Sequence, residues 1–393
     1  MTGAVLRVGF VALVDAAPVV IAHELGFASE EGLALDLVRA PSWSSLRDML
    51  ALGRTEAAQM LSAVPVAIAL GLGGLVTRLD AVQVLSINGD VIGVSRPLAA
   101  RMRARGYGFD FADAVAAGTA LIGAANGPLR IGVPFPFSMH AELLYYWLSA
   151  LGLPAPSAVS VRTVPPPLMA EAMRAGEIDA FCVGEPWGSI AVETGVGELL
   201  LPGAAIWARA PEKVLAVRHD WTQAAPDLLA RLMRAVWRAG RWLDDPANHI
   251  TTAEILARPA YLNVAAEIIE RCLSGRMVIS ARGEERSVPG MIGFHQGAAT
   301  FPWRSQAVWM AQQMATRMGL DRDSARQAAR AVFRTDLYRA ALADTGAEMP
   351  GASEKTEGAV SRPTPAASPS GRLFLQPDQF FDGRIFDPMT PER

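Results

Sequence analysis

Short apolar runs alternate with amphipathic segments over the first 90 residues of the chain. A short unbroken apolar run is typical of a buried strand, and apolar positions three or four residues apart are typical of a helix. The predicted strands are Leu6–Leu13, Leu33–Val38 and Ala81–Ile87, and the predicted helices are Pro18–Leu25 and Ser44–Leu52. This alternation predicts a mostly parallel sheet covered on both faces, with ligands at the carboxyl ends of its strands.

A second series of the same kind begins near residue 130. Its predicted strands are Arg130–Val133, Val159–Val164 and Ala180–Val183, and its predicted helices are His140–Leu151 and Pro167–Ala175. After Lys213 the spacing becomes helical, over Ala224–Leu243, Ala265–Leu273 and Ala307–Met318. We therefore expect two doubly wound α/β lobes, with residues 1–90 opening lobe I, residues 91–210 forming lobe II and residues 211–348 returning to lobe I.

The C-terminal part of the chain changes composition. Residues 349–371 are rich in Pro, Ser, Gly and Ala, and they carry too little apolar surface to stay ordered independently, which predicts a tether. Residues 372–393 contain Phe374, Phe380, Phe381 and Phe386. Because these rings would otherwise be exposed, we expect this last segment to dock back onto the fold.

Composition limits the class of protein. A length of 393 residues exceeds the roughly 250–300 at which a single core stops growing, and 51% hydrophobic residues are enough for a packed core. A net charge of −3 gives no basic surface, so we expect no direct contact with nucleic acid. Cys182 and Cys272 lie outside any metal or redox spacing and are expected to be free, buried thiols. Nothing in the sequence predicts a metal or a cofactor.

The N-terminus bears on localisation. The string MTGAVLRVGFVAL leads directly into a predicted strand and lacks the basic, apolar and cleavage regions of an export signal. No apolar run reaches the length of about 18 residues that a membrane-spanning helix needs. We therefore expect a cytoplasmic protein with no membrane partner.

Six strings along the chain carry a family resemblance. They are GFVALVDAAPVVIAHELGF, APSWSSLRDMLALG, VPPPLMAEAM, DAFCVGEPW, PEKVLAV and FFDGRIFDP. Together, and in this order, they resemble the nitrate-binding and bicarbonate-binding proteins of cyanobacterial-type ABC importers, the NrtA/CmpA family. The resemblance implies a type II periplasmic-binding-protein clamshell with two crossovers between its lobes. Without an export signal, the chain is most similar to the cytoplasmic nitrate/nitrite sensors called NasS, which hold an RNA-binding antiterminator (NasT-like) inactive until the anion arrives.

The same resemblance implies an anion site between the lobes. Its motif positions are filled here by Trp43, His140, Gly184 and Lys213. Nitrate is a planar monoanion that only accepts hydrogen bonds, so donors and one positive charge should converge on it. Lys213 supplies the charge, His140 opens a predicted helix whose dipole favours an anion, and Trp43 offers an indole N–H. Gly184 allows close approach of the backbone.

Two positions bear on which anion is bound. Bicarbonate-binding relatives carry an acidic residue where this chain has Lys213, so Lys213 favours nitrate or nitrite. Transport members have Asn-Gly-Gln where this chain has Asn88-Gly89-Asp90. An ionised Asp90 beside nitrate would be repulsive, so it either points away, pairs with Lys213 in the open state, or changes the ligand preference.

Each of these residues also has an ordinary structural explanation. Trp43 could be core, His140 a helix cap, Lys213 a solvated side chain and Gly184 part of a turn. Two other functions remain open. One is the substrate-binding component of a nitrate or bicarbonate ABC importer. The other is an enzyme on the same fold, for which Cys182 is the only candidate nucleophile, and the sequence contains no Ser/His/Asp or Cys/His string and no Gly-rich phosphate loop.

The mechanism favoured by the sequence is a population shift. An anion bound between two lobes stabilises the closed form because it contacts both. A partner that prefers the open form, here the antiterminator, is then released.

Overall fold

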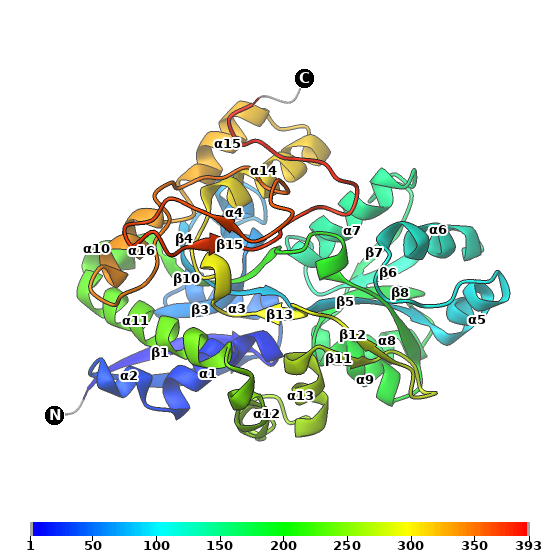
Figure 1. Ribbon diagram of the computed structural model, residues 1–393, viewed down its shortest axis with the longest axis horizontal. Helices are drawn as coiled ribbons and strands as arrows, with labels where there is room; N and C mark the ends of the chain where they lie inside the picture. Colours follow the sequence, from blue (N-terminus) through cyan, green and yellow to red (C-terminus); the bar gives the residue numbers. More distant parts are fainter. Residues whose placement is uncertain (1–2, 391–393) are drawn as a thin grey trace.

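The computed structural model describes residues 3–390. Within them, lobe I contains a six-stranded sheet in the order β13-β4-β10-β3-β1-β2, and lobe II contains a five-stranded sheet in the order β7-β6-β8-β5-β9 (Figure 1). The strands of lobe I are β1 (Ala4–Val11), β2 (Leu33–Ala40), β3 (Ala57–Leu61), β4 (Leu79–Asn88), β10 (Pro211–Arg218) and β13 (Ile292–Gly293). Those of lobe II are β5 (Asp90–Ser95), β6 (Arg130–Val133), β7 (Ser160–Thr163), β8 (Ala180–Gly184) and β9 (Gly197–Pro202). Two small ribbons pair β11 (Arg276–Val278) with β12 (Glu285–Ser287) and β14 (Thr364–Pro365) with β15 (Phe374–Leu375).

Helices surround both sheets. The first part of lobe I carries η1 (Val14–Ala16), α1 (Ala17–Glu24), α2 (Phe27–Glu30), α3 (Trp43–Ala51) and α4 (Ala63–Ala69). Lobe II carries α5 (Arg96–Ala104), α6 (Ala114–Ala124), α7 (Met139–Ala150), η2 (Pro166–Leu168), α8 (Met169–Arg174), α9 (Trp187–Glu193) and η3 (Gly203–Ala205). The return adds α10 (His219–Ala224), α11 (Pro226–Leu243), η4 (Pro246–Asn248), α12 (His249–Leu256), α13 (Ala266–Ser274), η5 (Gln296–Ala298), α14 (Arg304–Met318), α15 (Arg322–Arg330) and α16 (Thr335–Leu342). None of the helices within residues 3–390 has the length and apolarity that a membrane span requires.

The expected mostly parallel sheets are mixed sheets instead. β1 pairs with β2 and β3 in parallel, and β6 pairs with β7 and β8 in parallel, as the sequence predicts. However, β10 is antiparallel to β3 and β4, and β5 is antiparallel to β8 and β9. The reason is topological, since β5 and β10 enter their sheets directly from the opposite lobe, without the helix that makes a parallel connection.

The two crossovers lie side by side. The first passes from β4 to β5 through Gly89, whose φ of +94° suits glycine. The second runs through residues 203–210 from β9 to β10. Asn88 joins them, because its amide donates to the carbonyl of Ala208 at 2.9 Å and accepts from the N–H of Ala210 at 3.1 Å. The clamshell with two crossovers that the sequence implies is therefore present.

The lobes touch across the interface between them. The indole N–H of Trp187, at the start of α9, donates to the carbonyl of Ala12 at 2.7 Å. On another part of the interface, Arg317 of α14 pairs with Glu142 of α7, a carboxyl that is fully buried. Direct polar contacts of this kind indicate a closed arrangement.

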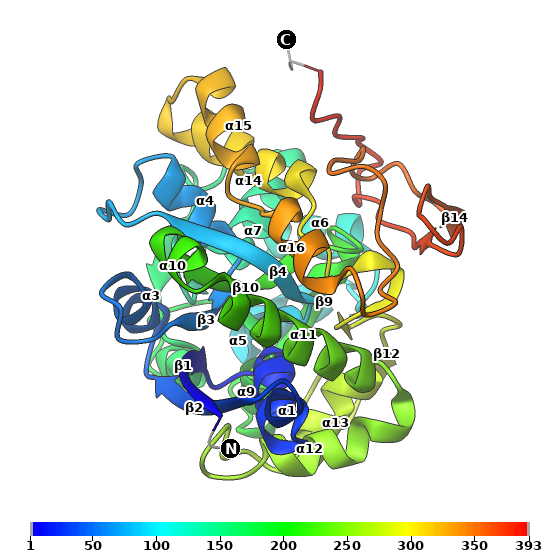
Figure 2. The same ribbon diagram turned by 90° about the vertical axis from the view of Figure 1, so that its left-hand side faces the viewer.

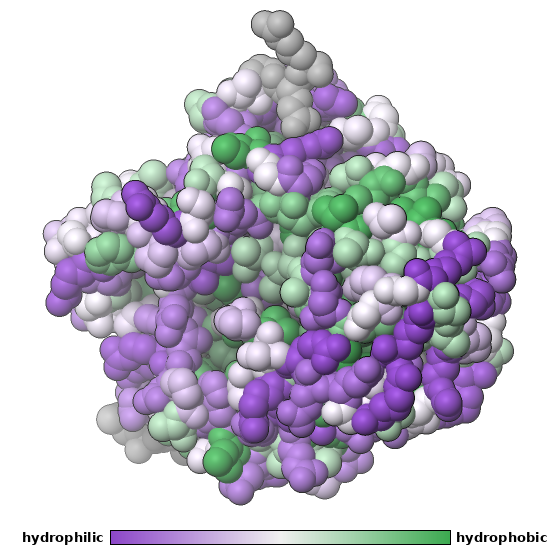
Figure 3. Space-filling view, turned by 45° about the vertical axis from the view of Figure 1, so that its right-hand side comes forward, coloured by the Kyte–Doolittle hydropathy of each residue, from purple (hydrophilic) through white to green (hydrophobic). Residues whose placement is uncertain are grey.

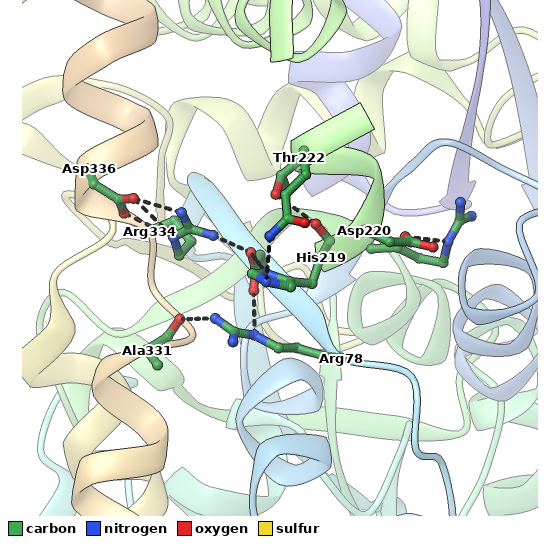
Figure 4. A network of polar contacts seen from close by, with 10 residues as sticks. Arg78, His219, Asp220, Thr222, Ala331, Arg334 and Asp336 are labelled. Atoms are coloured by element: carbon green, nitrogen blue, oxygen red, sulfur yellow. Dashed lines mark hydrogen bonds and ion pairs between the residues drawn. The ribbon is translucent and has the colours of Figure 1, made fainter. Parts of the chain in front are cut away.

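A polar network fastens the helical return onto lobe I. Asp80 of β4 is buried, and Arg78, His219 and Arg334 all contact its carboxylate (Figure 4). His219 begins α10 and Arg334 immediately precedes α16. Because three separate segments share one carboxylate, the network fixes their relative positions.

Residues 349–371, expected to be a tether, lie against the body of the protein. Glu357 is fully buried there, pairs with Lys355 at 2.5 Å and accepts a hydrogen bond from Ser305 of α14 at 2.6 Å. Lys355 also pairs with Asp378. The segment is therefore anchored by buried charges, a contribution that its low apolar content does not reveal.

The C-terminal segment packs over the crossovers and both lobes. Phe380 stacks on Trp207 of the second crossover, with ring centroids 4.7 Å apart, and lies 5.8 Å from Trp309 of α14. Tyr146 of α7 contacts Phe380 and donates to Asp382 at 2.8 Å. Phe380 and Phe386 are buried, whereas Phe374 stays about half exposed. Figure 2 shows this segment on the side of lobe I opposite α3; residues 391–393 of the predicted docking segment lie outside the described residues.

Candidate functional site

A buried cluster of polar side chains lies where the lobes meet. At its centre is Lys213 of β10, which has no solvent exposure. Its ammonium lies 2.8 Å from a carboxylate oxygen of Asp15, in η1, and 2.7 Å from one of Glu212. A buried lysine is rare unless it is paired, so these contacts are what makes its burial tolerable.

A bulge in β10 brings two adjacent side chains into the cluster. Neighbouring residues of a regular strand point to opposite faces of the sheet. Here the pairing of β10 with β4 shifts register between Pro211 and Lys213 and again before Val214, which re-aims the strand. Glu212 and Lys213 are both fully buried and in contact with each other.

Trp43 begins α3 and forms the lobe I wall of the cluster. The preceding Ser42 caps this helix by accepting from the N–H of Ser45 at 3.2 Å. The ammonium of Lys213 lies 5.3 Å from the centroid of the Trp43 ring, a cation–π distance. The indole N–H of Trp43 is buried and has no hydrogen-bond acceptor within the described residues.

His140 and Gly184 supply the lobe II wall. The helix predicted to begin at His140 begins one residue earlier, so His140 is the second residue of α7, and Ser138 caps that helix through the N–H of Ala141 at 3.2 Å. The Nδ1 atom of His140 lies 3.0 Å from a carboxyl oxygen of Glu212, but neither ring nitrogen makes a hydrogen bond among residues 3–390. A Cβ atom on Gly184 would lie 3.6 Å from Nε2 of His140 and 2.6 Å from Leu13 of lobe I.

Asp90 lies at the edge of this cluster, on the first crossover. It is buried and accepts a hydrogen bond from the thiol of Cys182 at 3.4 Å, while its other oxygen has no partner in the described part of the chain. It does not pair with Lys213 in this arrangement. Burial raises the pKa of Cys182 well above its usual value, and the charge of Asp90 adds to this effect, so the thiol stays protonated and is a poor nucleophile.

The structure adds three residues that the family motifs did not single out. Asp15 and Glu212 bind Lys213, and Gln59 of β3 donates to Asp15 while accepting from the N–H of Val11 at 3.0 Å. Asp15 interrupts an otherwise apolar stretch of the sequence, which is the one signal that could have indicated it. The expectation that donors and one positive charge converge is therefore incomplete, because carboxyl groups share the site.

Burial sets the protonation states of the cluster. Loss of solvent raises the pKa of Glu212 to about 8, although the charge of Lys213 opposes this effect. For Lys213 itself, burial acts to lower the pKa, but the charges of Asp15 and Glu212 outweigh it and the net shift is upward. Burial, reinforced by Lys213, lowers the pKa of His140 well below its usual value. At neutral pH the cluster thus holds a cationic lysine, a neutral histidine and a protonated Glu212.

This arrangement is suited to a small anion. Lys213 provides a positive charge that solvent does not reach, and Trp43 provides an N–H whose hydrogen-bonding capacity is unused. A neutral imidazole provides one further N–H, from His140. Buried donors without acceptors are costly, so an acceptor between the lobes would stabilise the closed form.

Comparisons with known proteins are consistent with this geometry. The model of the NMT1-like family matches residues 3–257. The chain is 32% identical over 99% of its length to the nitrate import ATP-binding protein NrtC of Synechococcus elongatus, of which it covers 54%. It is 29% identical over 98% of its length to the nitrate/nitrite binding protein NrtA of Nostoc, of which it covers 83%. The chain spans about half the length of the NrtC relatives, 54% and 45% for two of them.

A solved structure matches nearly the whole fold. The crystal structure of the periplasmic nitrate-binding protein NrtA from Synechocystis aligns with a TM-score of 0.82 at 26% identity, covering 98% of this chain and 96% of that one. The alkanesulfonate-binding protein SsuA from Xanthomonas axonopodis shares the fold at a TM-score of 0.58 and 16% identity, over 84% of this chain and 98% of that one.

Proposed function

We propose that this chain, which belongs to the NMT1-like family and is of the NrtA/CmpA type within it, binds nitrate or nitrite between its two lobes. The observation that carries the proposal is the pair of buried, unused N–H groups on Trp43 and His140 beside the buried ammonium of Lys213. The relatives named for nitrate binding or import support the choice of anion.

The chemistry of the ligand fits these groups. Nitrate and nitrite only accept hydrogen bonds, so each of their oxygens can take a donor from this cluster. Lys213 offers several N–H donors, because an ammonium carries three. Glu212 adds an O–H donor when it is protonated, and its pKa of about 8 keeps it so at neutral pH. In the absence of anion, Asp15 serves as the internal counter-ion of Lys213.

Binding between the lobes couples the anion to closure. Trp43 and Lys213 belong to lobe I, whereas His140 and Gly184 belong to lobe II. An anion that contacts both sets can form all of its contacts only in the closed arrangement. Its differential affinity for that arrangement then shifts the population toward it.

We further propose that closure is a signal read by a partner protein. The partner would be a cytoplasmic RNA-binding antiterminator (NasT-like) that prefers the open form, with this chain acting as a cytoplasmic sensor. Reciprocity requires that the partner weaken anion binding by the same factor by which the anion weakens partner binding. Co-purification with such a partner that nitrate abolishes is the expected result; binding unchanged by saturating nitrate would contradict the sensing role.

A second candidate is the substrate-binding component of a nitrate or bicarbonate importer. One observation favours bicarbonate, which carries its own O–H donor. When it is ionised, Glu212 offers a carboxyl oxygen that no donor reaches among residues 3–390, and Asp15 adds a second acceptor to the cluster. An acceptor of this kind suits a ligand with a proton to donate.

Calorimetric titration separates these ligands. The purified chain is titrated with nitrate, nitrite, bicarbonate and chloride at neutral pH, alongside the variant Lys213→Glu. We expect nitrate or nitrite to bind with a dissociation constant of roughly micromolar order, and the variant not to bind them. Heat from bicarbonate alone would favour the second candidate, and heat from none of the anions would refute an anion-binding cleft.

A further inference from the structure

A groove runs between the lobes on the side covered by the C-terminal segment. Its volume is about 470 Å³. One wall is α7 of lobe II, through Tyr145 and Tyr146, and the other is α14 of lobe I, through Trp309 and Gln313. Figure 3 shows apolar surface gathered on the lobe II face, below and to the right of the chain end. The groove is separate from the anion cluster, since none of its lining residues belongs to that cluster.

The charge of the groove is one-sided. Its lining contains Arg317, Arg322 and Arg384, and none of its described lining residues is Asp or Glu. This excess is local, because the whole chain has a net charge of −3. Arg317 is already paired with the buried Glu142, and Arg384 lies 3.3 Å from Asp382, although its side chain is 71% exposed. Arg322 is exposed at the start of α15 and makes no ion pair with the described residues. The rim of the groove can therefore contact an anionic group of another molecule.

The floor and rim also offer apolar contacts. Aromatic side chains from both lobes line the groove, and Ile385 on its rim is 63% exposed. An exposed branched apolar residue next to aromatic rings is typical of a contact surface. Arginine and aromatic residues are also the types most often found at the centre of protein interfaces.

From these observations we propose that the groove between α7 and α14 is a docking surface for an acidic segment of a partner protein, one that carries at least one large apolar side chain. The apolar side chain enters between the helices and its acidic neighbours meet Arg322 and Arg384. Because the two walls come from different lobes, the docked segment contacts both at once. The proposal holds whether or not nitrate is the ligand of the buried cluster.

The test uses the full chain and a phage-displayed library of random peptides. Selection is carried out against the wild type, and the affinity of the most enriched peptide is then measured by fluorescence anisotropy. We expect acidic peptides with an apolar residue, whose affinity falls about tenfold or more in the double variant Arg322→Glu/Arg384→Glu. A matched double variant on lobe II, Arg162→Glu/Arg174→Glu, changes two exposed arginines outside the groove and should bind normally.

Other outcomes would overturn the proposal. Enrichment of basic or neutral peptides, no enrichment, or equal binding by both double variants would exclude an acidic occupant at this site. Dimerisation of the wild type that Arg322→Glu/Arg384→Glu abolishes would assign the groove to a second copy of the chain. The substitution Ile385→Ser, at an exposed position, should also weaken peptide binding. The melting temperature of this variant shows whether its fold is intact. Nitrate titration of the same variants tests the proposed function separately. We expect these variants to bind nitrate with the affinity of the wild type.

Discussion

Glu212 should make nitrate binding depend on pH in the alkaline range. In the free protein, its carboxyl is neutral below about pH 8 and ionised above it. The neutral form donates an O–H to the anion, whereas the ionised form repels it. The complex therefore binds the proton more tightly than the free protein, and affinity is full below about pH 8 and falls as the pH rises through that value.

The size of the effect follows from the pKa. If only the protonated form binds, the apparent dissociation constant scales as one plus ten to the power of the pH minus the pKa. With a pKa of about 8, it changes little up to pH 7 and increases about tenfold between pH 7 and pH 9. Each further pH unit weakens binding by about 1.4 kcal/mol.

Lys213 and His140 are not expected to produce this slope. The upward shift keeps Lys213 charged over this range, and the downward shift keeps His140 neutral. Burial raises the pKa of Asp15, against the charge and hydrogen bond of Lys213, and burial also raises the pKa of Asp90. The substitution Glu212→Gln keeps a hydrogen-bond donor but removes the titration, so it isolates the contribution of this one carboxyl.

The assay is calorimetric titration with nitrate from about pH 6.5 to about pH 9.5. The wild type should show the tenfold loss, and Glu212→Gln should give a flat profile. Glu171→Gln, a change at an exposed position of α8, serves as the control and should keep the wild-type slope. A flat profile in the wild type, or a slope that survives in Glu212→Gln, would refute the assigned role.

Three further substitutions test the cluster. Lys213→Met should weaken nitrate binding about a thousandfold in calorimetry, because a charge pair about 4 Å apart contributes about 4 kcal/mol at an effective dielectric constant of 20; a loss below threefold would contradict this. Gly184→Ala should hinder closure against Leu13 and weaken nitrate binding about tenfold or more, with X-ray scattering showing an open form, whereas Gly108→Ala, where the added methyl meets open space, should not. Asp90→Asn should raise the melting temperature by roughly 2–4 °C at pH 8 but not at pH 4, since the raised pKa of Asp90 means that burial of its charge costs stability only at the higher pH; an equal gain at both pH values would exclude this cause.

Sequence patterns predict the bounds of a helix or strand best where its apolar residues follow one clear pattern. The predicted strand Arg130–Val133 matches β6 residue for residue, and the predicted helix Ala224–Leu243 differs from α11 only at its start. By contrast, β10 was not predicted, and the chain after Lys213 was interpreted as helical. Seven of its eight residues are buried, so the strand shows no alternation that could reveal it.

The family motifs predict four residues of the site, and the structure adds others that the motifs do not single out. Trp43, His140, Gly184 and Lys213 come together at the lobe interface, as the family resemblance implies. Their role in binding stays a prediction. Glu212 could not be placed from the sequence, because only the bulge in β10 turns it toward the same cluster as its neighbour.

The C-terminal part of the chain shows a second reason why prediction from the sequence fails. Low apolar content predicted a tether for residues 349–371, yet Glu357 is fully buried. Its partners, Lys355 and Ser305, are separated from it by 2 and 52 residues. Such long-range polar burial leaves no periodic trace in the sequence, and composition alone cannot predict it.

A crystal structure of the chain with nitrate would show directly whether an anion lies between the lobes against Trp43, His140 and Lys213. We expect planar density in the closed cleft, with oxygens about 3 Å from the Trp43 indole nitrogen, a ring nitrogen of His140 and the Lys213 ammonium. Nitrate bound elsewhere, with Lys213 still held only by Asp15 and Glu212, would contradict it.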